Sequence, residues 1–232
     1  MQTRREEILH KMRLVRPVVE TGYENLVQVR CLLEDEEAET SVERMLRSWS
    51  SEMLPEAMKK WSLNRSELVV EFGSYRDDWM RRDLRSWLES NSFYPGVCEA
   101  VAAARDGSTT EAYIVTTKQA RFALALLREI GEIPFEEDRV FSQTVSGQPK
   151  SEVLRMLEER HGGKNGDDVS FHFVEDKLST LEKVAADELM NKWNLYLVDW
   201  GYNTAEERER ARKNPRIEVI GVERFRELIM NK

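Results

Sequence analysis

The spacing of apolar residues along the chain changes character at residues 91–96, which read NSFYPG. Before this segment, apolar side chains recur every three or four residues, the period of an amphipathic helix. The pattern predicts helices at residues 16–34, 41–53, 62–71 and 77–89, with a strand left open for the third because of Leu68-Val69-Val70. Pro17 suits the first turn of its helix. Trp79 and Trp87 lie at helical spacing and are expected in the core.

After this segment, strand-like and helix-like patterns alternate. Strands are expected at residues 112–115, 139–142, 169–174, 194–198 and 217–220, and helices at residues 97–105, 118–130, 150–160, 180–190, 205–212 and 222–229. Such alternation predicts parallel pairing in one doubly wound sheet. The expected fold class is therefore α/β, a Rossmann-like doubly wound parallel sheet preceded by α-helices, with domains at residues 1–92 and 93–232.

Polar residues follow three of the expected strands. Thr116 and Thr117 follow the first strand, Glu175 and Asp176 follow the third, and residues 199–204 follow the fourth. Ligands of open parallel sheets bind outside the carboxyl ends of the strands, so these groups are expected to meet at one edge. Hydroxyls beside a helix start suit a phosphate, and Lys150 at a helix start adds positive charge. Adjacent carboxylates suit Mg²⁺.

Each group also has a purely structural explanation. Thr116 and Thr117 are suited to capping the helix that follows them. Glu175 and Asp176 favour a helix N-terminus through their charge. Lys150 is of a type that mostly lies solvated on the surface, and residues 199–204 are typical of a turn with Asn203 or Thr204 as the N-cap. His172 lies within a strand pattern and is expected to be packed rather than to bind a metal.

Composition excludes several classes of protein. The 232 residues carry a formal net charge of −8, which argues against nucleic-acid binding because no basic excess can release counterions. No apolar run approaches the ~20 residues of a membrane span, so no membrane association is expected. Two cysteines, Cys31 and Cys98, are too few for a disulfide framework. A reducing compartment, the cytoplasm, is the expected location.

Taken together, the motifs resemble the haloacid dehalogenase (HAD) superfamily of hydrolases. Residues 113–118, YIVTTK, are similar to its second motif, with Thr116 at the phosphate-binding hydroxyl. Lys150 falls where the lysine of the third motif belongs, and residues 173–176, FVED, resemble the acidic fourth motif. The resemblance implies a helical cap, a HAD-like α/β core, a small phosphorylated substrate held by Thr116, Thr117 and Lys150, and Mg²⁺ held by Glu175 and Asp176.

A narrower likeness comes from residues 16–23, RPVVETGY, together with residues 199–204, DWGYNT. These segments resemble a branch of the superfamily from photosynthetic organisms. That branch implies the plastid stroma as the location if the natural chain is longer at its N-terminus.

One motif of the superfamily is missing. Its first strand carries a nucleophilic aspartate and a second aspartate two residues later, whereas this sequence contains no Asp-x-Asp and its first aspartate is Asp35. No catalytic residue is therefore assigned. The expected function is an inactive phosphatase scaffold, and the alternative is a non-catalytic HAD-like domain that binds a phosphate ligand or a protein.

The missing strand is the central strand of the sheet in the superfamily. Three outcomes are open: another segment fills its place, the sheet closes up, or the sequence is a shortened form of a longer protein. Unpaired strand edges attract other chains, so self-association is expected unless the helix at residues 16–34 takes the place of the strand.

Overall fold

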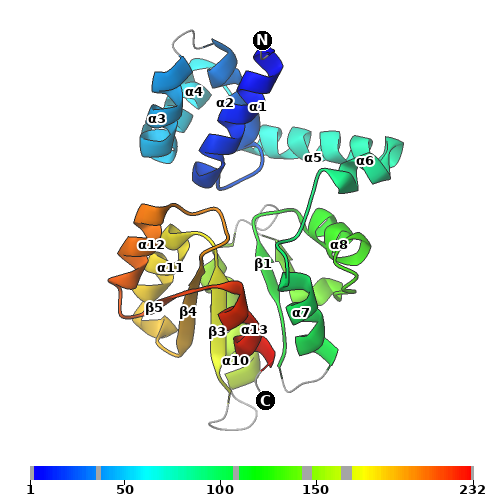
Figure 1. Ribbon diagram of the computed structural model, residues 1–232, viewed down its shortest axis with the longest axis vertical. Coiled ribbons are helices and arrows are strands. Elements are labelled where there is room, and N and C mark those ends of the chain that lie inside the picture. The colour runs from blue at the N-terminus through cyan, green and yellow to red at the C-terminus, as the bar shows by residue number, and fades with distance from the viewer. Residues whose placement is uncertain (1–2, 35–37, 107–109, 143–147, 163–168, 231–232) are drawn as a thin grey trace. The chain divides into compact units, whose positions relative to one another are not determined.

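The computed structural model describes residues 3–34, 38–106, 110–142, 148–162 and 169–230 (Figure 1). The chain forms two compact units, residues 1–87 and 88–232. The first unit is helical, and the second contains all the strands that the structure describes. None of the described helices is both long and apolar enough to cross a membrane.

The helical unit is built around a core of apolar side chains that includes Val15, Val27, Met45 and Trp49. Trp49 is fully buried, and its indole N–H donates to the Glu24 carboxylate over 2.9 Å. The elements are α1 (Arg4–Val15), η1 (Arg16–Val18), α2 (Glu24–Glu34), α3 (Ala38–Ser48), the π-helical η2 (Trp49–Met53), α4 (Leu54–Lys60), α5 (Arg65–Arg82) and α6 (Leu84–Glu89).

The prediction of one helix over residues 16–34 is wrong. The helix is interrupted between η1 and α2, and Gly22 lies in the break against the ring of Phe72. A Cβ atom at Gly22 would lie 2.4 Å from that ring, so any other residue there would require Phe72 to move. Glu24 stabilises the break because its carboxylate accepts hydrogen bonds from the backbone N–H groups of Glu20 and Thr21. This region packs in the core of the helical unit, so it does not take the place of a strand.

Three further expectations for this unit need correction. Helix α1 precedes residue 16 and was missed, although Thr3 and Glu6 form a capping box at its start. The two helices expected at residues 62–71 and 77–89 are one long helix, α5, followed by α6 after a break at Asp83. Trp87 is buried as expected, but Trp79 is 43% exposed and donates its indole N–H to Ser86.

The second unit follows the predicted alternation closely. Its elements are α7 (Val97–Asp106), β1 (Ile114–Thr116), α8 (Ala120–Glu129), η3 (Glu137–Arg139), β2 (Val140–Ser142), α10 (Lys150–Gly162), β3 (Phe171–Glu175), α11 (Leu178–Ala185), η4 (Glu188–Met190), β4 (Trp193–Val198), α12 (Ala205–Arg212), β5 (Ile217–Ile220) and α13 (Val222–Met230). The helix expected at residues 180–190 ends early, because Asp187 caps the separate turn η4.

The strands pair in parallel, as predicted, but form two sheets rather than one. Strands β1 and β2 form the first, and β3, β4 and β5 form the second in that order. The prediction of one continuous sheet is therefore wrong for the residues that the structure describes. In these residues no segment fills a central position, and the two sheets have not closed up into one.

Helices cover both faces of the larger sheet. Leu195 and Leu197 of β4 pack in a core with residues of α10 and α11, whereas Tyr196 and Val198 pack in another with residues of α7 and α13. Successive residues of a strand point to opposite faces, so a strand covered on both sides is apolar throughout. The expected α/β class, with helices on both faces of parallel strands, is confirmed at this level.

Candidate functional site

The centre of the candidate site is an ion pair between the Lys150 ammonium and a carboxylate oxygen of Glu175. Lys150 is the first residue of α10, and Glu175 is the last residue of β3. Both are withdrawn from solvent, since the Lys150 side chain is 14% exposed and that of Glu175 is 5% exposed. A buried pair of this kind holds its charges in fixed positions at the carboxyl end of the sheet.

Glu175 is also bonded to the chain that follows it. Its second carboxylate oxygen accepts a hydrogen bond from the backbone N–H of Lys177 over 3.1 Å, which shapes the turn from β3 into α11. Burial raises the pKa of Glu175 above its ordinary value of 4.5, Lys150 opposes this, and the neighbouring Asp176 carboxylate raises it further. The pair is therefore sensitive to the protonation of Glu175.

Asp176 fixes the loop that follows β4. Its carboxylate accepts a hydrogen bond from the backbone N–H of Tyr202 over 3.0 Å. The amide of Asn203, which is buried, donates to the carbonyl oxygens of Asp176 and Val198 over 3.0 and 2.8 Å. A Cβ atom at Gly201 would lie 2.2 Å from the Cβ of Asp176, so the loop requires glycine at this point.

Thr116 ends β1, and its hydroxyl shapes the turn there. The Thr116 oxygen accepts a hydrogen bond from the backbone N–H of Lys118 over 3.0 Å. The hydroxyl of Ser142, at the end of β2, donates to the Lys118 carbonyl over 3.0 Å. Thr117, between Thr116 and Lys118 in the sequence, is half-buried.

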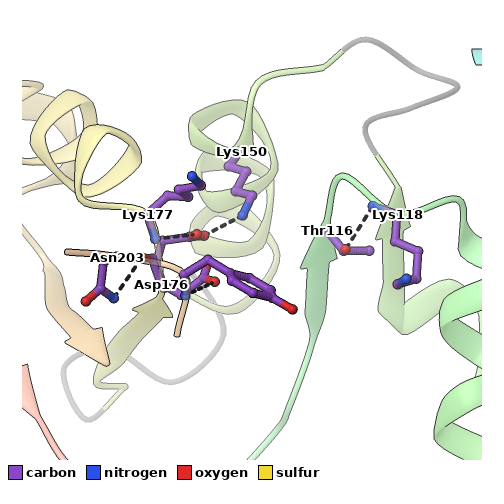
Figure 2. Close-up of polar contacts among 8 residues, drawn as sticks. Thr116, Lys118, Lys150, Asp176, Lys177 and Asn203 are labelled. Atoms are coloured by element: carbon purple, nitrogen blue, oxygen red, sulfur yellow. Dashed lines mark hydrogen bonds and ion pairs between the residues drawn. The ribbon is translucent and has the colours of Figure 1, made fainter. Parts of the chain in front are cut away.

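The structure brings some of the predicted site residues together more closely than others. Lys150, Glu175 and Asp176 form one group at the end of β3, and Thr116 lies in a second group at the end of β1 (Figure 2). Both groups follow the carboxyl ends of parallel strands. The residues assigned to phosphate from the sequence are thus divided between the end of β1, which holds Thr116, and the start of α10, which holds Lys150.

The acidic pair expected to hold magnesium already makes an ion pair and hydrogen bonds within the protein. Mg²⁺ takes one or two carboxylates together with waters and phosphate oxygens. Here both oxygens of Glu175 already accept hydrogen bonds, one from Lys150 and one from Lys177, and Asp176 binds Tyr202. No group of three or more histidine, cysteine, aspartate or glutamate side chains gathers in the described part of the chain. Magnesium binding stays a prediction.

Some of the structural explanations are confirmed and others are not. Thr204 is the N-cap of α12 and forms a capping box with Glu207, as the turn interpretation predicted. Thr116 does not cap α8, whose N-cap is Gln119, because its oxygen bonds within its own turn. His172 stacks on Tyr196 of the neighbouring strand with the tyrosine hydroxyl 3.0 Å from its ring nitrogen.

A polar cluster before β1 was not predicted. The Tyr113 hydroxyl lies 2.8 Å from a carboxylate oxygen of Glu111 and 2.8 Å from Nε2 of His161, at the end of α10. Burial raises the pKa of Tyr113, as does its bond to Glu111. His161 lies 48 positions from Tyr113 in the sequence, so no local pattern could have revealed the full cluster. Its position at the start of β1 places it away from the carboxyl end.

Comparison with known proteins identifies no relative. A scan of protein-family models, a search of curated proteins and a search of solved structures each found no match to this chain.

Proposed function

We propose that this chain is a HAD-like hydrolase scaffold that binds a small phosphorylated molecule at the carboxyl ends of β1 and β3 without hydrolysing it. The observation that supports this most strongly is the buried pair of Lys150 and Glu175. An ammonium group has three N–H donors, and Glu175 occupies one of them. The other donors of Lys150 suit phosphate oxygens.

Thr116 is the second proposed contact. Its oxygen accepts from the Lys118 N–H, and this leaves the hydroxyl hydrogen to donate to a phosphate oxygen. Thr117 follows at the same turn.

The arrangement of strands supports the relationship to the superfamily. Removing the central strand of a doubly wound parallel sheet leaves two smaller parallel sheets whose inner edges have no partner. The observed pairing, β1 with β2 and β3 with β4 and β5, has this form. A helical unit precedes the α/β unit in the chain, as a cap precedes the core in the proposed scaffold.

Hydrolysis is not proposed because, among the described residues, the two carboxylates of the proposed site are already bonded to other groups. HAD phosphatases use an aspartate nucleophile with Mg²⁺ beside it. In this sequence no Asp-x-Asp occurs. Asp176 is held by Tyr202 and Glu175 by Lys150. We expect no Mg²⁺-dependent release of aryl alcohol from an aryl phosphate, and robust turnover that is lost in Asp176→Asn would contradict this.

Binding is tested by titrating inorganic phosphate and following the protein by heteronuclear NMR. We expect chemical-shift changes centred on the amides near Thr116 and Lys150. Lys150→Ala should weaken binding by roughly tenfold or more, as expected for the loss of one charge-assisted hydrogen bond. Lys192→Ala is the matched control, since Lys192 is 69% exposed and contacts Glu158. Equal weakening by both variants would show that the effect is general electrostatics rather than a site.

A further inference from the structure

Four strands of the α/β unit, β1, β2, β3 and β5, have an edge without a partner strand among the described residues, and the edges of β1 and β3 are of interest here. Strand β1 pairs with β2 alone, and β3 pairs with β4 alone. All three residues of β1 are half-buried. Strands of parallel sheets are normally buried on both faces and paired on both sides. An edge strand leaves alternate backbone N–H and C=O groups free to pair with another chain.

Helix α10 connects these two edges. Its first residue, Lys150, is paired with Glu175 of β3, and His161 near its end contacts Tyr113, which leads into β1. Buried residues of α10, such as Leu154, lie in one apolar cluster with Phe173 of β3, and Val115 of β1 packs against the same cluster. Both edges therefore border one core under one helix.

The width of α10 can be compared with the spacing of strands in a sheet. An α-helix with its side chains is about 10–12 Å across. Neighbouring strands of a sheet lie about 4.8 Å apart, so two strands with one more between them span about 10 Å. A helix that contacts both β1 and β3 suits an interval of one strand between them.

The residues of the two edges define the chemistry of an incoming strand. Natural edge strands that must stay unpaired usually carry lysine, proline or a bulge. The three residues of β1, Ile114, Val115 and Thr116, carry no charge and no proline. In β3 the titratable side chains are His172, which is exposed, and Glu175, which is paired with Lys150. On the face that Phe171 and Phe173 share, a charged side chain of an added strand would be buried in the apolar cluster.

We propose that β1 and β3 together accept one extended, uncharged, apolar segment of a separate polypeptide, which adds as a strand and pairs with both edges. A segment of about five residues matches β3, which has five. A second copy of this chain is the poorer occupant. Its described strands lie within its own folded unit, so its sheet could reach one edge but not enter between two. This inference rests on sheet topology and is independent of phosphate binding.

The test uses a synthetic peptide of alternating valine and isoleucine, about five residues long, with lysines at both ends for solubility. Hydrogen exchange of the intact chain is followed by mass spectrometry, without phosphate in the buffer. We expect the amides of β1 and β3 to be slowed together, by roughly tenfold or more at saturating peptide. Strand β4, which is already paired on both sides, serves as the internal control.

N-methylated peptides distinguish insertion between two edges from addition to one. In a strand with two neighbours, alternate N–H groups point to opposite sides. Methylation of either the odd or the even positions should therefore reduce protection by roughly tenfold or more. Retained protection with either methylated peptide, slowing at one edge alone, or no slowing at all would overturn the proposal. So would a dimer in sedimentation experiments whose β1 and β3 amides are protected before peptide is added, because a second copy would then be the occupant.

Discussion

Replacing Lys150 by methionine tests how much the buried ion pair contributes to the stability of the α/β unit. Methionine keeps much of the apolar length of the lysine side chain and removes its charge. Glu175, whose side chain is 5% exposed, then loses the cation that faces its carboxylate. Removing one partner of a buried pair costs about 3–5 kcal/mol, because the remaining charge is buried without compensation.

The pKa of Glu175 determines whether the stability cost of Lys150→Met rises or falls with pH. Burial already raises this pKa above 4.5, and loss of Lys150 raises it further. Between the unfolded and folded pKa values the native state binds more protons than the unfolded state, so native stability falls as pH rises. Each additional unit of pKa corresponds to about 1.4 kcal/mol. The penalty of Lys150→Met should therefore be small near pH 4.5 and largest at neutral and alkaline pH.

Hydrogen exchange of the β3 and β4 amides measures this cost. This method reports the opening of the α/β unit separately from that of the helical unit. Global unfolding is less suitable, because a chain with two units need not unfold in a single two-state transition. Lys192→Met, at an exposed lysine, should cost less than about 1 kcal/mol. Adding Glu175→Gln to Lys150→Met should recover much of the loss and remove its pH dependence. A cost below about 1 kcal/mol at alkaline pH, or one that does not change with pH, would refute the reasoning.

Two further substitutions test the loops around the site. Gly201→Ala should destabilise the α/β unit by about 1–3 kcal/mol in urea unfolding, because the added Cβ would overlap the Cβ of Asp176. Gly162→Ala is the control and should be tolerated, because the nearest neighbour of its added Cβ is 3.9 Å away, and equal effects of the two variants would contradict this. Thr204→Ala should cost about 1 kcal/mol through loss of the capping box on α12, measured by the same transition, and an unchanged midpoint would show that the cap is dispensable.

Elements that depend only on local sequence patterns could be predicted from the sequence. The alternation of strands and helices after residue 96 follows from apolar spacing and turn residues, and the cap at Thr204 follows from a local box. The breaks in the helical unit depend on contacts between distant residues. Gly22 is opposed by Phe72, which lies in another helix, and no periodicity within residues 16–34 could show this.

The candidate site was predictable only in part for the same reason. The positions of Thr116, Lys150 and Glu175 at strand ends and a helix start follow from the local pattern. The ion pair between Lys150 and Glu175 joins residues twenty-five positions apart, and the assignment of β1 and β3 to two different sheets depends on which strands pair. Strand pairing is non-local, so a sequence pattern gives the strands without giving their neighbours.

The central claim is that an anion binds between the Thr116 turn and Lys150. A crystal of the protein soaked in tungstate, an anion with the shape and charge of phosphate, tests it directly through anomalous scattering. The account predicts one tungstate in contact with the Lys150 ammonium and the Thr116 hydroxyl, and its loss in Lys150→Ala. Tungstate bound elsewhere, with Lys150 held by Glu175 alone, would contradict the account.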